Sequence, residues 1–370
     1  MKPKIIIALN AAWNLYNFRS GLILFLLKNG FDVIGIAPED EYVPRIKALG
    51  CRFINVKMSP KGLNPWQDLR LLFQYYKILR YEKPDVFLGF TVKPNIYGSI
   101  AAHLLKIPVI NNIAGLGIVF QKNNWLTKLV LSLYSLALYK SRNVFFQNKE
   151  DKLIFLKKFN FLNSKCDVLP GSGVDLKKFS PVPLKNKKNL HCLMIARLLW
   201  DKGVLEFVEA AKILRKNYLD LDFLLLGYLD NQDKSYIPYK VLKEWSKGGL
   251  IKYLGSSDDV RKHIAKADCI VLPSYYPEGT PRVLLEAAAM GRPIITTNTK
   301  GCRNVVDDGL NGYLCRPKDS ADLAEKIIKV FELDYDARRK MGELGRKKVE
   351  QEFDEAVVCS KYLREISSLF

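Results

Sequence analysis

Histidine is scarce in this sequence, and the cysteines are not spaced for a metal. The 370 residues include three histidines and seven cysteines, and no two cysteines form a C-x-x-C pair. A zinc centre is therefore not expected. The odd, dispersed cysteines are typical of reduced thiols in a cytosolic protein, mostly buried as small apolar side chains.

Long apolar runs are also missing. No segment reaches the ~18 apolar residues of a membrane-spanning helix. The nearest one, WLTKLVLSLYSLALY at 125–139, is shorter and contains Lys128. The first residues, MKPKIIIALN, lack the pattern of a signal peptide, and their apolar run is typical of a buried strand.

Acidic residues are heavily outnumbered. The chain has 58 Lys and Arg against 38 Asp and Glu, a formal net charge of +20. Residues 1–170 contain 24 basic and 10 acidic residues, a net charge of +14, which leaves +6 for the rest. This excess indicates an anionic partner such as nucleotide phosphates, an acidic membrane surface or nucleic acid, but no nucleic-acid-binding module is visible.

Apolar strands alternate with amphipathic helices along the whole chain, which predicts an α/β protein with doubly wound parallel sheets. Strands are expected at 4–9, 32–37, 53–56, 85–89, 109–112, 143–147, 191–196, 222–227, 251–253, 269–272, 293–297 and 312–315. Helices are expected near 18–29, 40–49, 66–80, 95–105, 124–140, 203–216, 235–246, 258–265, 281–290, 320–332, 335–350 and 351–370.

A turn-rich joint near 168–180, DVLPGSGVDLKKFS, interrupts the alternation. Because 370 residues exceed the usual size of one hydrophobic core, two domains are expected. They cover residues 1–170 and 171–352, with a C-terminal helix at about 353–370 packing back on the first. Ligands of such sheets bind beyond the carboxyl ends of the strands, so two facing domains would form a cleft.

One motif, SYYPEGTPRVLLE at 274–286, places two glutamates eight residues apart. It follows an apolar strand, and Thr280 as N-cap with Pro281 at the first helical position predicts a helix start. A helix N-terminus favours an anion, so a phosphate could lie there while Glu278 and Glu286 bind hydroxyls on either side. The alternative is a capped helix with two solvated glutamates.

A second motif, ARLLWDKG at 196–203, places Arg197 and Lys202 on the turn after another strand. Both cations can converge on one anionic group, such as a leaving diphosphate. Arg and Lys are common at strand ends, so the value of this motif lies in its agreement with the first.

Together, R-x4-K and E-x7-E resemble the nucleotide-sugar site of the retaining GT-B glycosyltransferases of family 4. Further similar stretches are GSGVDLKKF, YLGSSDDV, LLEAAAMGRPIITTNTKGCRNVV and DGLNGYL. FTVKPNIYGSIAA at 90–102 and NNIAGLG at 111–117 resemble a bacterial subgroup that builds lipid-linked oligosaccharides, including PglA-type N-acetylgalactosaminyltransferases. The resemblance implies two Rossmann-like domains facing across a cleft, the second binding the nucleotide sugar.

The resemblance also implies residue roles. Arg197 and Lys202 would hold the diphosphate, Glu286 the ribose and Glu278 the donor sugar, with Glu278, Arg197 and Lys202 as the catalytic set. The backbone of Gly279, Thr280, Pro281, Arg282 and Val283 would lie along the phosphates and sugar, and the base near Tyr253 and Leu254. Transfer would proceed with retention and without a metal or other cofactor; the one D-x-D match, at 220–222, opens a buried strand.

In the first domain the resemblance implies an acceptor site. The family's usual histidine is absent, and Lys93 stands in that region, with Asn95 nearby; a surface lysine is the alternative. Asn14, Asn17 and Arg19 lie on the expected turn after the first strand and are further candidates. His103 is expected to be a packing residue.

The implied activity is transfer of a sugar, such as GalNAc from a UDP-sugar, to a polyprenyl-diphosphate-linked saccharide in bacterial glycan assembly, including protein glycosylation. Basic and aromatic residues at 64–83 and 123–146 would place the enzyme in the cytoplasm, peripherally on the anionic inner face of the plasma membrane. The structural alternative is that both segments are core helices with a solvated basic face. Other functions left open are a GT-B-like sugar-nucleotide 2-epimerase, a transferase using a GDP-sugar for capsule or O-antigen, and a binding protein without turnover.

Overall fold

The computed structural model describes residues 2–59, 64–115, 125–187, 189–215, 217–218, 220–230, 233 and 235–370. The chain forms two compact units, unit 1 from Met1–Ser172 with Glu355–Phe370, and unit 2 from Gly173–Asp354. Each unit boundary falls two residues after the one expected from the sequence.

Unit 1 contains a parallel sheet in the order β3-β2-β1-β4-β5-β6-β7. The strands are β1 (Lys4–Ala8), β2 (Asp32–Ala37), β3 (Arg52–Asn55), β4 (Val86–Phe90), β5 (Val109–Ile113), β6 (Asn143–Phe146) and β7 (Cys166–Val168). Most are continuous apolar runs because helices cover both faces of the sheet.

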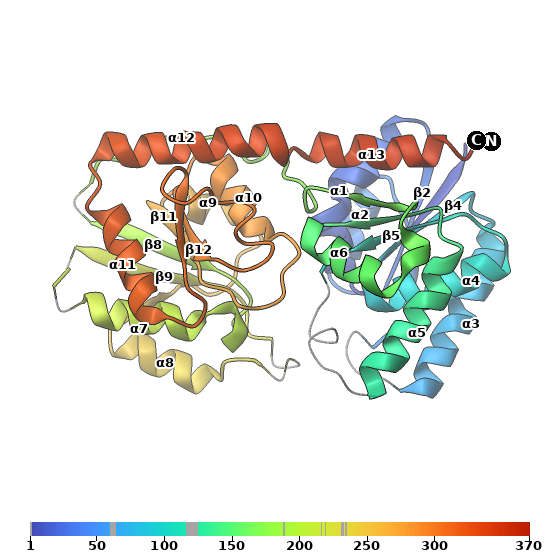
Figure 1. The fold of residues 1–370 in the computed structure, drawn as a ribbon, viewed down its shortest axis with the longest axis horizontal. Helices are drawn as coiled ribbons and strands as arrows, with labels where there is room; N and C mark the ends of the chain where they lie inside the picture. The colour runs from blue at the N-terminus through green and yellow to red at the C-terminus, as the bar shows by residue number, and fades with distance from the viewer. Residues whose placement is uncertain are drawn as a thin grey trace. The chain divides into compact units, whose positions relative to one another are not determined.

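Helices cover both faces of the unit 1 sheet (Figure 1). One core joins the strands to α1 (Ala12–Lys28), α2 (Val43–Ala48) and α13 (Glu355–Ser367). The cores of the other face contain α3 (Pro65–Glu82), the π-helical turn η1 (Pro94–Gly98), α4 (Ser99–Leu104), α5 (Trp125–Tyr139), α6 (Lys149–Lys158) and the short helix η3 (Asn160–Leu162). As expected, the last helix packs by an apolar face, with Val358, Tyr362 and Ile366 buried.

Unit 2 contains a second parallel sheet, in the order β10-β9-β8-β11-β12-β13. Its strands are β8 (Leu190–Ile195), β9 (Leu221–Leu226), β10 (Lys252–Tyr253), β11 (Cys269–Leu272), β12 (Ile294–Thr297) and β13 (Gly312–Cys315). Its helices are η4 (Trp200–Lys202), α7 (Val204–Leu214), α8 (Tyr239–Lys247), α9 (Arg261–Ile264), α10 (Arg282–Ala289), α11 (Ser320–Phe331) and α12 (Tyr335–Glu352). The predicted pair of Rossmann-like parallel-sheet domains is confirmed.

The first helix differs from the prediction. The sequence predicts a turn up to Arg19, but α1 already begins at Ala12. Both asparagines that suggested a loop lie on this helix. Asn17 Nδ2 donates to the Trp13 carbonyl within it at 3.0 Å, and Asn14 Nδ2 donates to Oδ1 of Asn10, just before the helix, at 2.7 Å. The prediction also omitted α6, which is rich in charged residues, and β7, which has only three residues.

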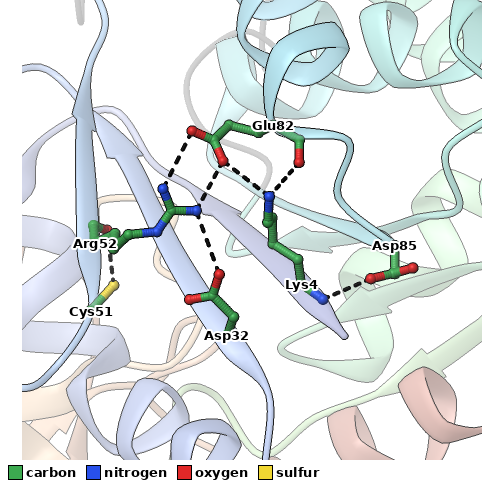
Figure 2. Close-up of polar contacts among 6 residues, drawn as sticks. All are labelled: Lys4, Asp32, Cys51, Arg52, Glu82 and Asp85. Atoms are coloured by element: carbon green, nitrogen blue, oxygen red, sulfur yellow. Dashed lines mark hydrogen bonds and ion pairs between the residues drawn. The ribbon is translucent and has the colours of Figure 1, made fainter. Parts of the chain in front are cut away.

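A charged cluster joins the amino ends of the unit 1 strands to the end of α3 (Figure 2). Glu82 accepts from Arg52 at 2.9 Å and from Lys4 Nζ at 3.2 Å, and Arg52 also contacts Asp32 at 3.4 Å. The backbone N–H of Lys4 donates to Asp85 at 2.7 Å. Burial by itself would raise the pKa of Glu82, but the hydrogen bonds from Arg52 and Lys4 outweigh it and lower that pKa. This edge is opposite the carboxyl ends of the strands, so the cluster stabilises the fold.

Candidate functional site

The two sequence motifs of unit 2 form neighbouring loops. Residues 196–203 follow β8 and residues 273–281 follow β11, and β8 and β11 are adjacent in the sheet. Because the strands are parallel, both loops lie at the same edge. The backbone N–H groups of Tyr275 and Tyr276 both donate to the Asp201 carbonyl, at 3.0 and 2.9 Å.

Two glycines permit this close contact between loops. Gly203 has φ +81°, and a Cβ there would lie 2.1 Å from the Pro273 carbonyl oxygen. Gly301, at φ +77°, would place a Cβ 2.0 Å from the Gly279 carbonyl oxygen. Any side chain would therefore push the loops apart, so glycine at these positions fixes the backbone around Glu278.

Lys202 and Glu278 are in direct contact. Lys202 Nζ donates to Glu278 Oε1, and their side chains are only 12% and 13% exposed. Ser274 Oγ donates to the same carboxylate oxygen at 3.1 Å. One residue of each motif is therefore in contact with the other. Such proximity is necessary if the two residues are to bind the same ligand.

Arg197 lies near two carboxylates that the sequence analysis missed. Its guanidinium donates to Asp230 at 3.2 Å and is 3.7 Å from an Asp233 oxygen. Both aspartates follow β9, the strand beside β8. Their place after an adjacent strand was the signal that could have identified them, but it depends on the strand order.

Tyr276 contacts both cations and was also missed. Its ring centroid is 4.7 Å from Lys202 Nζ and 6.0 Å from the Arg197 guanidinium carbon. Burial raises the pKa of the Tyr276 phenol, so the ring stays neutral near pH 7. An aromatic face attracts cations. Tyr276 thus holds the two basic side chains on one side of the site.

The helix after the second motif begins later than predicted. Helix α10 starts at Arg282 with Pro281 as its N-cap, so the prediction of Thr280 as N-cap and Pro281 as the first helical residue is wrong. Pro281 has φ −64° and ψ 118°, an extended conformation outside the helix, and Thr280 is 9% exposed. The N–H groups of Arg282 and Val283 still stand at the start of this helix, where an anion is favoured.

Glu286 is paired within its own helix. Arg282 Nε donates to Glu286 Oε1 at 3.0 Å, and these side chains are 12% and 13% exposed. Burial raises the pKa of Glu286, and the nearby Arg282 charge opposes that rise. The solvated-glutamate alternative is wrong for both glutamates, because each is mostly buried and bonded to a cation.

Tyr253 and Leu254 lie at the same edge of the sheet, beside β9. Tyr253 Oη donates to the Gly227 carbonyl at 2.9 Å, and the Leu254 N–H donates to the Leu225 carbonyl at 2.8 Å. Both therefore line the end of β9, the strand that leads to Asp230.

The predicted acceptor residues on the first helix lie in the body of α1 rather than on a turn. Arg19 is 4% exposed and its guanidinium carbon lies 4.2 Å from the Phe90 ring centroid. Asn14 and Asn17 are partly buried, and their amides donate to residues four positions earlier, Asn10 before the helix and Trp13 within it. The loop assignment was wrong because asparagine residues also bond along a helix.

Lys93 and Asn95 are more buried than a surface lysine and an acceptor-binding asparagine would be. Lys93 is no surface lysine, since its Nζ is 2.7 Å from Asp68 Oδ1 and the two side chains are 11% and 6% exposed. Asn95 is 1% exposed, donates to the Asn112 carbonyl at 2.8 Å and accepts from Asn111 Nδ2 at 2.9 Å. Asn95 is therefore a residue of the core rather than a contact for the acceptor.

Within the described ranges, no group of three His, Cys, Asp or Glu side chains could hold a metal ion. The D-x-D match lies at the start of β9, a strand with four of six residues buried, and the Asp222 side chain is 46% exposed and 3.5 Å from His191. None of the helices in the described part of the chain is both long and apolar enough to span a bilayer.

Family models match both units. Residues 4–148 match the model described as Glycosyl transferase 4-like, and residues 175–348 match Glycosyl transferases group 1. The chain is 31% identical, over 96% of both proteins, to the N,N'-diacetylbacillosaminyl-diphospho-undecaprenol alpha-1,3-N-acetylgalactosaminyltransferase of Campylobacter jejuni. It is 28% identical, over 71% of this chain and 70% of the relative, to the UDP-Gal:alpha-D-GlcNAc-diphosphoundecaprenol alpha-1,3-galactosyltransferase of Escherichia coli.

Solved structures share the fold over the full length. A glycosyltransferase from Rickettsia africae superposes with a TM-score of 0.82 at 20% identity, over 100% of this chain and 98% of the other. Anabaena HepE in complex with UDP and glucose gives 0.81 at 17% identity, over 99% and 100%. With the two parallel-sheet units and the matched family models, these similarities show that the chain belongs to the GT-B glycosyltransferases with a 4-like and a group 1 domain.

Proposed function

We propose that this glycosyltransferase moves a sugar, an N-acetylhexosamine such as GalNAc, from a UDP-sugar to a polyprenyl-diphosphate-linked saccharide, with retention of configuration. The contact between Lys202 and Glu278 carries the proposal, because it brings the two halves of the expected donor site together. The names of the two relatives describe transfer to sugars on diphosphoundecaprenol, which supports the acceptor class.

The cations would stabilise the leaving group. As the bond between the sugar and the diphosphate breaks, negative charge develops on the phosphate, and Arg197 with Lys202 would neutralise it. Lys202 now bonds to Glu278, so the donor phosphate would share or replace that bond. Glu278 would then be available for the hydroxyls of the donor sugar, and Glu286 would bind the ribose.

The proposed chemistry needs few further groups. In retaining transfer from the same face, the leaving phosphate would accept the proton of the attacking acceptor hydroxyl. Arg197 and Lys202 are expected to replace a metal ion as the counter-charge of the diphosphate.

The positions of the three histidines argue against the 2-epimerase alternative, because such an enzyme would use acid and base side chains next to the sugar. His103 Nε2 is 2.7 Å from the Ala137 carbonyl in unit 1, and its packing role was expected. His191 lies near Asp222 at the start of its strand, and His263 is on α9. In the described part of the chain, the histidine contacts are with residues other than Lys202 and Glu278.

Unit 1 would lie on the anionic inner membrane through α3 and α5. Trp66 and Tyr81 on α3 are 76% and 85% exposed, and Trp125 and Tyr139 on α5 are 75% and 61% exposed. Exposed Arg70, Lys77 and Arg80 accompany them on α3, and Lys128 on α5. Aromatic rings favour the headgroup region, and each well-placed cation adds about 1 kcal/mol on an anionic leaflet.

The proposal is tested by product analysis. The protein is incubated with UDP-GalNAc, other UDP-sugars or GDP-sugars and with undecaprenyl-diphosphate-linked saccharides, and mass spectrometry detects an extended glycolipid. We expect one UDP-sugar to give product, with the anomeric configuration retained by NMR. Glu278→Gln should reduce transfer more than it weakens UDP binding. Donor epimerisation without any extended glycolipid, or product from GDP-sugars alone, would contradict the proposal.

Membrane attachment has a separate test. Trp66→Ser combined with Trp125→Ser should lower co-sedimentation with vesicles containing anionic lipid, whereas Leu153→Ser, at a residue that is 58% exposed on α6, serves as the control. Equal sedimentation of all three proteins would count against the two helices as the contact surface.

A further inference from the structure

Arg197 is in contact with a turn that carries two carboxylates. Its Nη1 is 3.2 Å from Asp230 Oδ2 and 3.7 Å from Asp233 Oδ2. The side chains of Arg197, Asp230 and Asp233 are 30%, 17% and 22% exposed, so these charges are partly shielded from water and still within reach of a ligand. Charges in such a setting interact more strongly than on the open surface. We call Asp230 and Asp233 the acidic turn.

We propose that the acidic turn competes with phosphate groups for Arg197 and so selects the UDP-sugar donor over the UDP product. The inference rests on the proposed function, in which Arg197 binds the diphosphate. Two carboxylates contact this guanidinium. A phosphate that binds Arg197 therefore has to displace at least one of them, and it is then repelled by both.

Hydrogen bonds fix the acidic turn. The Asp233 N–H donates to the Asp230 carbonyl at 2.9 Å, which closes the turn, and the Ser235 N–H donates to Asp233 Oδ1 at 3.0 Å. The other oxygen of the same carboxylate, Oδ2, is the one that lies near Arg197. A short side chain bonded to its own backbone is already ordered, so these contacts differ from a chance pairing of long surface side chains.

The segment that contains the acidic turn is also bonded to the motif that contains Arg197. Before the turn, the Leu198 N–H donates to the Tyr228 carbonyl at 3.1 Å. After the turn, the Trp200 N–H donates to the Ser235 carbonyl at 2.8 Å, and the Ile237 N–H donates to the Leu198 carbonyl at 3.0 Å. Because backbone bonds lie on both sides of the turn, its carboxylates would stay beside Arg197 after a phosphate has displaced them.

Negative charge distinguishes the product from the donor. The diphosphate of a UDP-sugar is esterified at both ends and carries about two negative charges, whereas the terminal phosphate of free UDP has a second ionisation, with a pKa of about 6, that adds about one more near pH 7. Fixed carboxylates repel this additional charge. The acidic turn should therefore weaken the binding of UDP more than that of the donor, which favours product release, a step that often limits turnover.

Calorimetry with three ligands tests the inference. They are UDP, UDP-GalNAc and the methyl ester of UDP at its terminal phosphate, which has the charge of the donor but no sugar. In Asp230→Asn and in Asp233→Asn, the Kd should fall about 10-fold for UDP and about 3-fold for the other two ligands. The matched control is Asp222→Asn at the amino end of β9, where the side chain is 46% exposed, and it should change each Kd by less than about 2-fold.

Product inhibition of sugar transfer gives a second readout. In Asp230→Asn the Ki for UDP should fall more than the KM for the UDP-sugar, so the ratio of Ki to KM should decrease about 3-fold. Asp230→Glu keeps the negative charge and should restore the ratio found for wild type. A side chain that only supported the local fold would not change this ratio with its charge.

The outcomes separate the inference from the proposed function. Unchanged Kd values, or weaker binding of all three ligands in both variants, would overturn the inference and leave the proposed function intact. Weaker binding of UDP-GalNAc alone would also overturn it, because the carboxylates would then bind the donor sugar. If no acceptor gives an extended glycolipid while UDP binds more tightly to both variants, the proposed function fails and the inference stands.

Discussion

The two units differ in how far their predicted polar site residues are exposed to solvent. In unit 2, Lys202 is the last residue of the short helix η4 and Glu278 is on the loop after β11, and the two side chains are partly accessible and in contact with each other. In unit 1, Asn95 and Arg19 are on helical segments and are 1% and 4% exposed. The first pair can exchange a protein partner for a ligand. The second pair would have to leave the core to do so.

The difference shows that residue type and approximate position do not by themselves predict whether a side chain can reach a ligand. The local backbone conformation also has to be known. Unit 2 places its motif residues on turns held by Gly203 and Gly301, where side chains of neighbouring strands meet. Unit 1 extends its helices closer to the strands, so the same kinds of side chain bond within the helix or to neighbouring core segments. Four experiments test this contrast.

The largest effect is expected from Lys202→Met. The change removes a cation from the leaving diphosphate and leaves Glu278 without its ion pair, so kcat/KM for sugar transfer should fall about 100-fold. Transfer is measured by mass spectrometry of the glycolipid. The control is Lys212→Met on α7, whose side chain is 64% exposed. A loss of less than about 3-fold would exclude Lys202 from the catalytic set.

Asn95→Leu should act on stability instead. The substitution removes the donor to the Asn112 carbonyl and the acceptor of Asn111 Nδ2, although Asn111 keeps Ser99 at 2.8 Å. We expect the free energy of unfolding to drop by about 2 kcal/mol in urea denaturation. The exposed Asn163→Leu is the control. If Asn95→Leu kept full stability but raised the acceptor KM, the contrast between the units would be wrong.

Tyr276→Leu is expected to weaken UDP binding about 5-fold, because the aromatic face no longer holds Arg197 and Lys202 together. Tyr276→Phe keeps the ring and should bind UDP like wild type, as measured by calorimetry. Tyr275→Leu is the matched control, since the Tyr275 ring centroid is 4.8 Å from Lys318 Nζ. Equal losses in the Phe and Leu variants would assign the effect to the hydroxyl.

Glu82→Gln should give the smallest effect, on the order of 1 kcal/mol of unfolding free energy, with no change in transfer. The lowered pKa of Glu82 means that its contribution is present above the ordinary Glu pKa and is lost as pH falls through the lowered one. The stability difference between wild type and variant should therefore shrink below about pH 4. Exposed Glu41→Gln is the control. A difference that grew on acidification would contradict the sign.

Much of the fold could be read from the sequence, because apolar period and turn residues are local signals. The strands expected at 32–37, 269–272 and 312–315 match β2, β11 and β13. Errors fell where local signals are ambiguous, as at the start of α1 and at the N-cap of α10. Lys93 was placed after the correct strand, but its partner Asp68 is 25 residues away and could not be found from spacing.

The sequence by itself determined the alternation of strands and helices, the two parallel sheets, and the two motifs of unit 2. It did so because hydrophobic period, glycine and proline act within a few residues. Only the tertiary structure decided that Tyr276 contacts both cations, that Asp230 and Asp233 contact Arg197, and that Asn95 and Arg19 are buried. Those outcomes depend on which strands are neighbours and on which side chains lose contact with water, and both are set by contacts between distant residues.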